Sequence, residues 1–288
     1  MYYALILLSV IMFGGCFALQ DVYRKMRGSG ICISMEAACV GSFTGLIVLL
    51  LVNGFQLEFT LFTLMMGLLA AINGIAFTFC SFKALDVINL SLFSLFSMLG
   101  GMVLPFAQGI VFYGEQITVA KVVCVVFICA ALVLTVTRGE KKKGYLYYVG
   151  IFVLNGMSGV LSKLFNELPF EKTSAAGYTL WISICTVVLS GVAWLIMFQK
   201  KNPSEPRYSW RACAVGAVSG GVNKVANFLL VIALIHVDAS VQYPMVTGGV
   251  MIVSTLICFF GDRKPSKKEM LSVGLAFLGM LALFIIPI

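Results

Sequence analysis

The chain has 288 residues, of which 60% are hydrophobic and only 11% are charged, and its mean hydropathy is +1.02. An ordinary soluble domain has roughly 25% charged residues, so this composition excludes a water-coated globular domain and indicates a protein whose main solvent is lipid. The net charge of +8 arises from bases that cluster between apolar segments without interleaved aromatic residues, which argues against nucleic acid as a partner.

Long apolar segments follow one another along the whole chain. In hydrocarbon each backbone polar group must be satisfied within its segment, which leaves helices of roughly 20 residues or a closed barrel, and these runs are too long for barrel strands. The sequence therefore predicts an all-α integral membrane protein, whose first span lacks a basic n-region and is expected to be retained. Its ten transmembrane helices are predicted at residues 2–20, 34–52, 61–84, 91–112, 119–137, 147–165, 174–198, 212–235, 240–260 and 270–286.

Basic residues alternate between the two sides of this predicted assembly. Odd-numbered connections, which follow the first, third, fifth, seventh and ninth spans, hold sixteen of the twenty Lys and Arg residues. The even-numbered connections hold only Lys121, Lys163 and Lys172. Because basic residues mark the cytoplasmic side, we expect the odd connections to be cytoplasmic and both termini to lie outside, in a multi-pass protein of the cell membrane.

Internal repetition divides the chain into two halves. The stretch 67–91 matches 216–240 at a constant offset of 149, and Gly114 later meets Gly261 at an offset of 147. A five-span unit that was duplicated and lightly edited gives such a pattern.

The two predicted repeats cover residues 1–140 and 141–288, each with five helices. A repeat with an odd number of spans must insert upside down, and the charges agree, because four bases lie within 261–268 whereas the matched connection at 114–116 has none. Inverted repeats with a site near the membrane midplane are typical of secondary transporters.

The end of the fourth span carries the most distinctive motif. Residues 112–118 read Phe-Tyr-Gly-Glu-Gln-Ile-Thr and precede a span rich in small residues, and residues 260–266 read Phe-Gly-Asp-Arg-Lys-Pro-Ser, with Asp for Glu. With these motifs and its five-span halves, nearly the whole chain resembles the drug/metabolite transporter superfamily, in its ten-span EamA-like branch. The resemblance implies a carrier of metabolites or xenobiotics, often an exporter, with a central cavity open alternately to either side. Glu115 of the motif, near the first turn of the fifth span, is interpreted as structural.

Lys224 is the charge that the sequence places deepest in the membrane. Thirteen positions separate it from Arg211 and eleven from Ile235, too many for its amine to reach either surface easily. An intramembrane charge is costly and usually faces a cavity. Asn223 and Asn227 share a helical face beside it through their i, i+4 spacing. A bound carboxylate or phosphate would stabilise the lysine, and the alternative is a lysine tied to helix carbonyls or to a nearby Ser or Asn.

Five further residues are weaker candidates for contact with a solute. Asn73, Asn155, Gln242 and Tyr243 fall in inner spans of the two halves, and interhelical hydrogen bonding is the alternative for each. Tyr178 has an aromatic ring that can stack on a ligand or sit at the membrane interface.

The acidic residues argue against a buried carboxylate relay. None of the twelve lies in the middle of a predicted span, unlike the small multidrug-resistance proteins, whose first span holds a buried Glu; here the first span offers only Gln20 near its end. Glu36 is the nearest candidate, and its expected role is to pair with Arg24 or Lys25 at the cytoplasmic interface. Facilitated diffusion or anion exchange is therefore favoured over proton antiport.

The predicted function is secondary transport of a small metabolite, an amino acid or organic-anion-like solute, by alternating access and in the direction of export. A multidrug exporter of cationic compounds is the alternative. One histidine, His236, cannot build a multi-histidine metal site, nine cysteines show no metal-binding spacing, and no GxxxxGK[ST] is present. We therefore expect no enzyme activity, no cofactor and no metal. A channel is disfavoured because no filter-like loop is visible. The expected partners are a small-molecule solute and membrane lipid, with the protein a monomer or homodimer.

Overall fold

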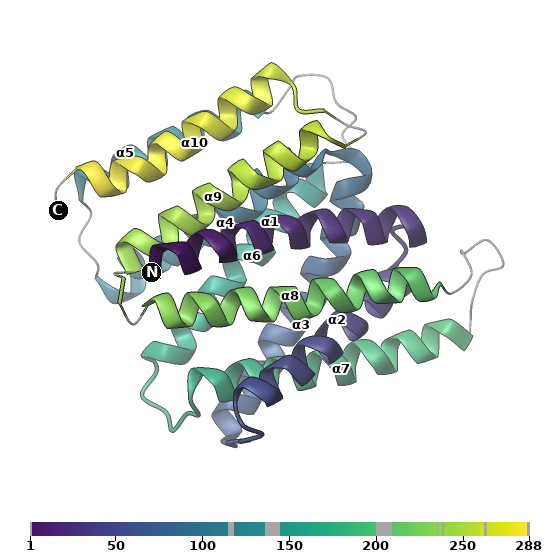
Figure 1. Ribbon diagram of the computed structural model, residues 1–288. Helices are drawn as coiled ribbons and strands as arrows, with labels where there is room; N and C mark the ends of the chain where they lie inside the picture. Colours follow the sequence, from purple (N-terminus) through teal and green to yellow (C-terminus); the bar gives the residue numbers. More distant parts are fainter. Residues whose placement is uncertain are drawn as a thin grey trace.

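A computed structural model describes residues 2–114, 118–135, 145–199, 209–234, 236–237, 239–261 and 264–286 (Figure 1). These residues form α-helices joined by short connections, with no strand among them, so the expectation of an all-α membrane protein is confirmed. Seven helices of this described part, α1–α4 and α6–α8, are long and apolar enough to cross a membrane. The helices are α1 (Tyr2–Arg27), α2 (Ile31–Val52), α3 (Leu61–Val87), α4 (Leu90–Tyr113), α5 (Val119–Thr135), α6 (Tyr145–Glu167), α7 (Ala175–Gln199), α8 (Trp210–Leu234), α9 (Ala239–Phe259) and α10 (Lys267–Ile285).

Local chemistry at the helix ends explains where the predicted bounds were wrong. Helix α1 continues past the apolar segment to Arg27, because Asp21 forms ion pairs with Arg24 and Lys25 along the last turns, and it ends at Gly28 with φ +94°. Helix α10 starts three residues earlier than predicted, at a capping box that begins with Ser266.

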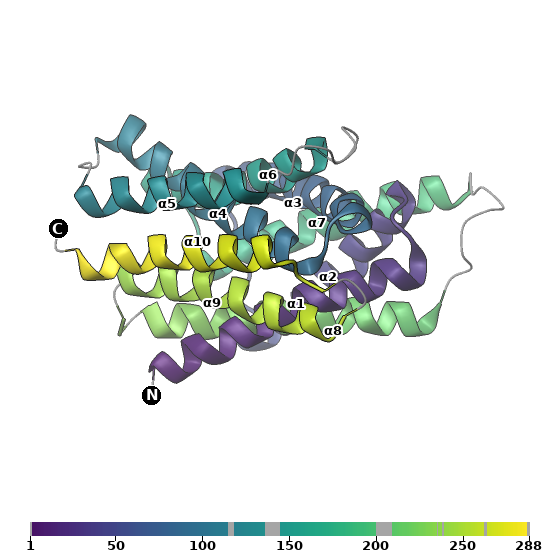
Figure 2. The same cartoon turned by 90° about the horizontal axis from the view of Figure 1, so that it is seen from above.

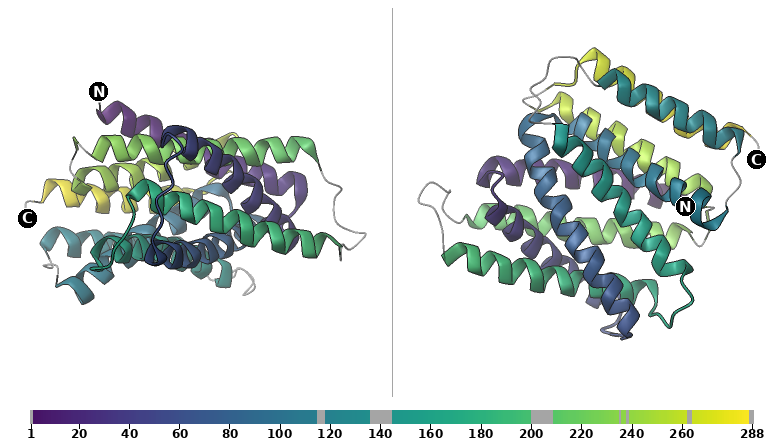
Figure 3. Two further views of the ribbon diagram at one scale, coloured as in Figure 1. Left: turned by 90° about the horizontal axis from the view of Figure 1, so that it is seen from below. Right: turned by 180° about the vertical axis from the view of Figure 1, so that it is seen from behind.

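The helices form two layers beside a crossed pair. Figure 2 shows α3, α4, α5 and α6 on one side and α1, α8, α9 and α10 on the other. Helices α2 and α7 pack against each other beside them, and α5 packs on α10 away from this pair (Figure 3). Helix α6 packs on α3 and α4. In the same way, α1 packs on α8 and α9, the helices five places further along the chain.

The connections gather at two opposite ends of the helices. Helix α1 starts and α10 finishes at one end, which we call the even-loop end because the α2–α3 and α6–α7 connections lie there (Figure 1). The opposite end, which carries the α1–α2 and α3–α4 connections, is called the odd-loop end.

Glycines let the backbones of α2 and α8 approach each other closely. Gly41 of α2 faces Gly216 and Gly220 of α8, and these two glycines of α8 have the small-xxx-small spacing. A Cβ atom built on Gly220 would overlap the backbone of Gly41. The contact therefore holds α2 and α8 at a separation that only glycine permits.

Candidate functional site

A cavity of about 340 Å³ lies among six helices, α1, α2, α3, α6, α7 and α8. Three of these helices come from each half of the chain. Its wall combines small and aromatic residues with many neutral polar groups, and these polar groups are Gln20, Tyr23, Ser42, Thr78, Ser158, Ser162, Tyr178, Thr186, Ser219 and Asn223. A mostly concave space with a few convergent polar groups is the usual form of a small-molecule site, and this volume is at the lower end of the ~300–1,000 Å³ range of such sites.

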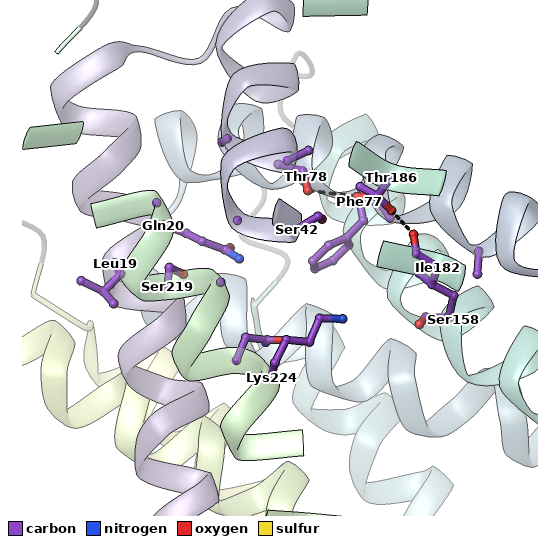
Figure 4. A pocket seen from close by; sticks show the side chains of 18 of the residues that line it. Leu19, Gln20, Ser42, Phe77, Thr78, Ser158, Ile182, Thr186, Ser219 and Lys224 are labelled. Atoms are coloured by element: carbon purple, nitrogen blue, oxygen red, sulfur yellow. Dashed lines mark hydrogen bonds between the residues drawn. The ribbon is translucent and has the colours of Figure 1, made fainter. Parts of the chain in front are cut away.

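Lys224 is the charged residue of this wall. Its side chain extends from α8 into the cavity, between the side that carries Gln20 and the side that carries Ser158 (Figure 4). The aliphatic stem rests on Gly45 of α2, where an added Cβ would come within 2.8 Å of Lys224 Cγ. Glycine at this position of α2 therefore makes the room through which the amine reaches the cavity.

The ammonium group of Lys224 has no protein partner in the described part of the chain. It forms neither a hydrogen bond nor an ion pair there, and the side chain is half-buried. None of the described residues that line the cavity is acidic. The alternative in which Lys224 is tied to a carbonyl, Ser or Asn is thus not what the structure shows.

Glu36, the acidic residue that the sequence offers as a candidate for the cavity, is engaged with Tyr23 and Arg27 instead. Its carboxylate accepts from the Tyr23 hydroxyl at 2.8 Å and from Arg27 Nη2 at 2.5 Å and Nε at 3.2 Å. The side chains of Arg27 and Glu36 are only 4% and 2% exposed. Tyr23 also lines the cavity, so the buried triad of Tyr23, Arg27 and Glu36 fixes the position of one residue of its wall.

The expected partners of Glu36 were wrong. Arg24 instead binds Asp21 at 2.7 Å and Asp86 at 2.5 Å, and Lys25 binds Asp21 at 3.1 Å. The physical reason is the pitch of α1, because Tyr23 and Arg27 are four residues apart and share the buried face, whereas Arg24 and Lys25 point away from it.

The structure brings three predicted residues together in the cavity wall and places three elsewhere. Lys224, Asn223 and Tyr178 line the cavity. Asn227, in contrast, is exposed and donates to the carbonyl of Asn223 in its own helix at 2.8 Å.

Asn73 and Asn155 form bonds between helices. Asn73 Nδ2 donates to the carbonyl of Leu154 at 2.9 Å, joining α3 to α6, and Asn155 Nδ2 donates to the carbonyl of Ser97 at 2.6 Å, joining α4 to α6. Interhelical hydrogen bonding is the role that the sequence analysis gives as the alternative to solute contact for both residues.

Two groups of predicted residues lie outside what the structure describes. The side chains of Gln242 and Tyr243 in α9 are outside the described set, and so is Glu115 of the family-like motif.

Two residues of the site that the sequence did not single out are Gln20, which lines the cavity, and Gly45, on which the stem of Lys224 rests. Gln20 Oε1 is buried and lacks a hydrogen-bond partner among the described residues. Two sequence features could have pointed to these residues. Gln20 is an amide near the end of an apolar span, and Gly45 follows Gly41 at four-residue spacing in α2.

An aromatic stack begins at Tyr178 in the cavity wall. The ring of Tyr178 stacks on Phe165 with 4.1 Å between centroids, and Phe165 stacks on Phe62 at 5.9 Å. Phe62 also contacts Phe170 at 5.0 Å. The stack joins α3, α6 and α7, so it spans both halves of the chain.

Polar contacts between two connections lie beside this stack. Thr63 Oγ1 accepts from the backbone N–H of Thr173 at 3.1 Å, and the Glu58 carboxylate accepts from the N–H of Ser174 at 2.6 Å. Trp181 Nε1 donates to the carbonyl of Glu58 at 2.7 Å. We call these five residues the even-loop latch, because they join the α2–α3 connection to the start of α7.

Comparisons with known proteins bear on the fold alone. No family model matches the chain, and no curated protein matches it. A solved structure described as "Crystal structure of protein" is similar over 95% of this chain and 96% of its own, with a TM-score of 0.60 and 17% sequence identity. The all-helical arrangement of this chain is thus shared, over nearly its full length, with a protein known from crystallography.

Proposed function

We propose that the protein is a secondary transporter that moves a small solute across the cell membrane by alternating access, in the direction of export. The observation that carries the proposal is the cavity between six helices, three from each half of the chain, with Tyr23 of the buried triad and Tyr178 of the aromatic stack in its wall. A central site between two halves that can move against each other is what alternation requires.

The proposal includes ten spans in two inverted halves, residues 1–140 and 141–288, as in the EamA-like branch of the drug/metabolite transporters. Its support is the paired contact pattern, in which α6 packs on α3 and α4 as α1 packs on α8 and α9. The two layers also exchange members when each helix is replaced by the one five places along the chain (Figure 2). In this arrangement the base-rich odd-loop end faces the cytoplasm and both termini lie outside.

Solute counterflow tests the transport function. Purified protein is first melted with a panel of amino acids, organic anions, phosphorylated metabolites and cationic drugs, because a bound solute raises the melting temperature by mass action. Liposomes that contain the protein and are loaded with the stabilising solute are then expected to take up labelled solute against its gradient, with saturation. Absence of flux for every stabilising solute would count against a carrier, and unsaturated ion current without counterflow would indicate a channel.

Weakening the even-loop latch is expected to open that end of the protein more often. Thr63→Val removes the acceptor of the Thr173 N–H, and Thr63 and Thr173 are both buried. Leaving a buried donor unpaired costs about 1–3 kcal/mol, so exchange of the Thr173 amide with deuterium should speed up by roughly one to two orders of magnitude.

Thr179→Val is the matched control for this substitution. The hydroxyl of Thr179 bonds only within α7, to the carbonyl of Ala175 at 2.8 Å, so the latch stays intact. Equal exchange rates of the Thr173 amide in the two variants would show that the latch does not hold the even-loop end closed.

A further inference from the structure

We infer that the cavity binds a compact organic anion whose acidic group contacts Lys224 and whose remainder carries hydrogen-bond donors. The inference rests on the proposed transport function, and it selects one solute class where that function leaves several open. It also predicts that the cavity does not bind the cationic compounds that a multidrug exporter would carry.

Charge is the first argument. A positive charge inside a membrane protein is stable when an opposite charge or a set of acceptors compensates it. Lys224 has neither among the described residues, and the cavity wall they form has no carboxylate. A carboxylate or phosphate on the solute supplies the missing charge, whereas a cation would add repulsion.

The carboxylate of Glu36 does not change this balance. One oxygen of Glu36 accepts hydrogen bonds from Tyr23 and Arg27, and the other accepts one from Arg27. The charges of Glu36 and Arg27 therefore neutralise each other, and both carboxylate oxygens have partners. The ammonium group of a zwitterion would accordingly meet only neutral acceptors in this wall, which favours a net anion.

The second argument concerns the remainder of the solute. The hydroxyl of Thr78 donates to the carbonyl of Gly74 at 3.0 Å, and that of Thr186 donates to the carbonyl of Ile182 at 2.7 Å (Figure 4). Their protons are therefore used, and each oxygen is left with acceptor capacity only.

Gln20 Oε1 adds a third acceptor, which is buried and unpartnered among the described residues. Wall groups that accept call for a solute that donates, through hydroxyl or amide N–H groups. The hydroxyls of Tyr178 and Ser162, which interact with each other, lie in the same wall, and the Phe77 ring offers an apolar face. A hydroxylated carboxylate or a sugar phosphate has this combination of groups, and the cavity of about 340 Å³ limits it to a small molecule.

A charge series on one carbon skeleton tests the inference. Detergent-purified protein is melted with gluconate, glucose and glucosamine, which are anionic, neutral and cationic, and with glycerol 3-phosphate beside glycerol. We expect gluconate, glycerol 3-phosphate or both to raise the melting temperature at millimolar concentration, and the neutral and cationic members to leave it unchanged. The two acids separate carboxylate from phosphate recognition.

Two variants connect the effect to Lys224. Lys224→Met keeps the length of the side chain without its charge and is expected to abolish the anion-dependent shift, while Gly45→Ala displaces the stem of Lys224 and is expected to weaken the apparent affinity about tenfold or more. Gly15→Ala is the control, because a Cβ there meets nothing within 4 Å. If Lys224→Met does not fold, Gly45→Ala carries the test.

The outcomes separate the solute class from the transport function. Stabilisation by glucosamine, or no shift with either acid, or an undiminished shift in both site variants would overturn the anion class. An anion that binds through Lys224 but is not moved in liposomes would leave the class standing and overturn transport. Saturable counterflow of a cation or a neutral solute would support transport and overturn the anion class.

Discussion

Replacing Gly220 by alanine is expected to destabilise the protein by about 1–3 kcal/mol, which is the usual cost of overpacking a close contact. The new methyl group would overlap the carbonyl group of Gly41 across the contact between α2 and α8. Backbone atoms cannot move aside as the end of a flexible side chain can, so the two helices must separate. Because α2 and α8 both line the cavity, the separation also changes the shape of the site.

Gly41→Ala is the matched control on the opposite helix. Its methyl group would lie 3.6 Å from the carbonyl oxygen of Gly216 and 3.8 Å from Gly220 Cα, which are ordinary contact distances. Alanine also favours a helix over glycine by about 1 kcal/mol, so this variant should melt at the wild-type temperature or above. Equal melting temperatures for Gly220→Ala and Gly41→Ala in detergent would contradict the close approach of α2 and α8 at this point.

The helices could be predicted because their signal is local. An apolar run such as 61–84 must satisfy its own backbone in lipid, and that requirement alone gives a helix. The ends depend on other interactions. Helix α1 reaches Arg27 through ion pairs of Asp21, and α10 begins at the capping box of Ser266, neither of which a hydropathy profile contains.

The sequence could predict those site residues whose role follows from their depth in the membrane alone. Lys224 was identified because it is far from both ends of its span, and the structure does place it in the cavity wall. Asn73 and Asn155 could not be assigned from sequence, because an inward amide can meet either a solute or the carbonyl of a neighbouring helix. That choice depends on which backbone lies opposite, as Leu154 and Ser97 do here.

The role of Gly45 shows a further limit of the sequence. Its spacing from Gly41 predicts close helix packing, but the identity of the group that fills the space depends on how α2 and α8 are aligned. In the structure that group is the stem of Lys224.

Removing one member of the buried ion pair between Arg27 and Glu36 is expected to cost about 3–5 kcal/mol, because the other charge stays buried without its opposite charge. Arg27→Met leaves a carboxylate that is 2% exposed beside Tyr23, and Glu36→Met takes the opposite charge away from a guanidinium that is 4% exposed. Thermal melting in detergent should show a large loss for each single variant.

The double variant distinguishes a charge effect from a general loss of packing. With both charges replaced by methionine no uncompensated ion remains, so the double variant should be more stable than either single one. Lys25→Met is the control on the same helix, because Lys25 is 43% exposed in its pair with Asp21, where such a pair contributes at most about 0.5 kcal/mol. Additive losses in the double variant would mean that the two side chains act independently. The triad with Tyr23 would then not be the unit that holds this residue of the cavity wall in place.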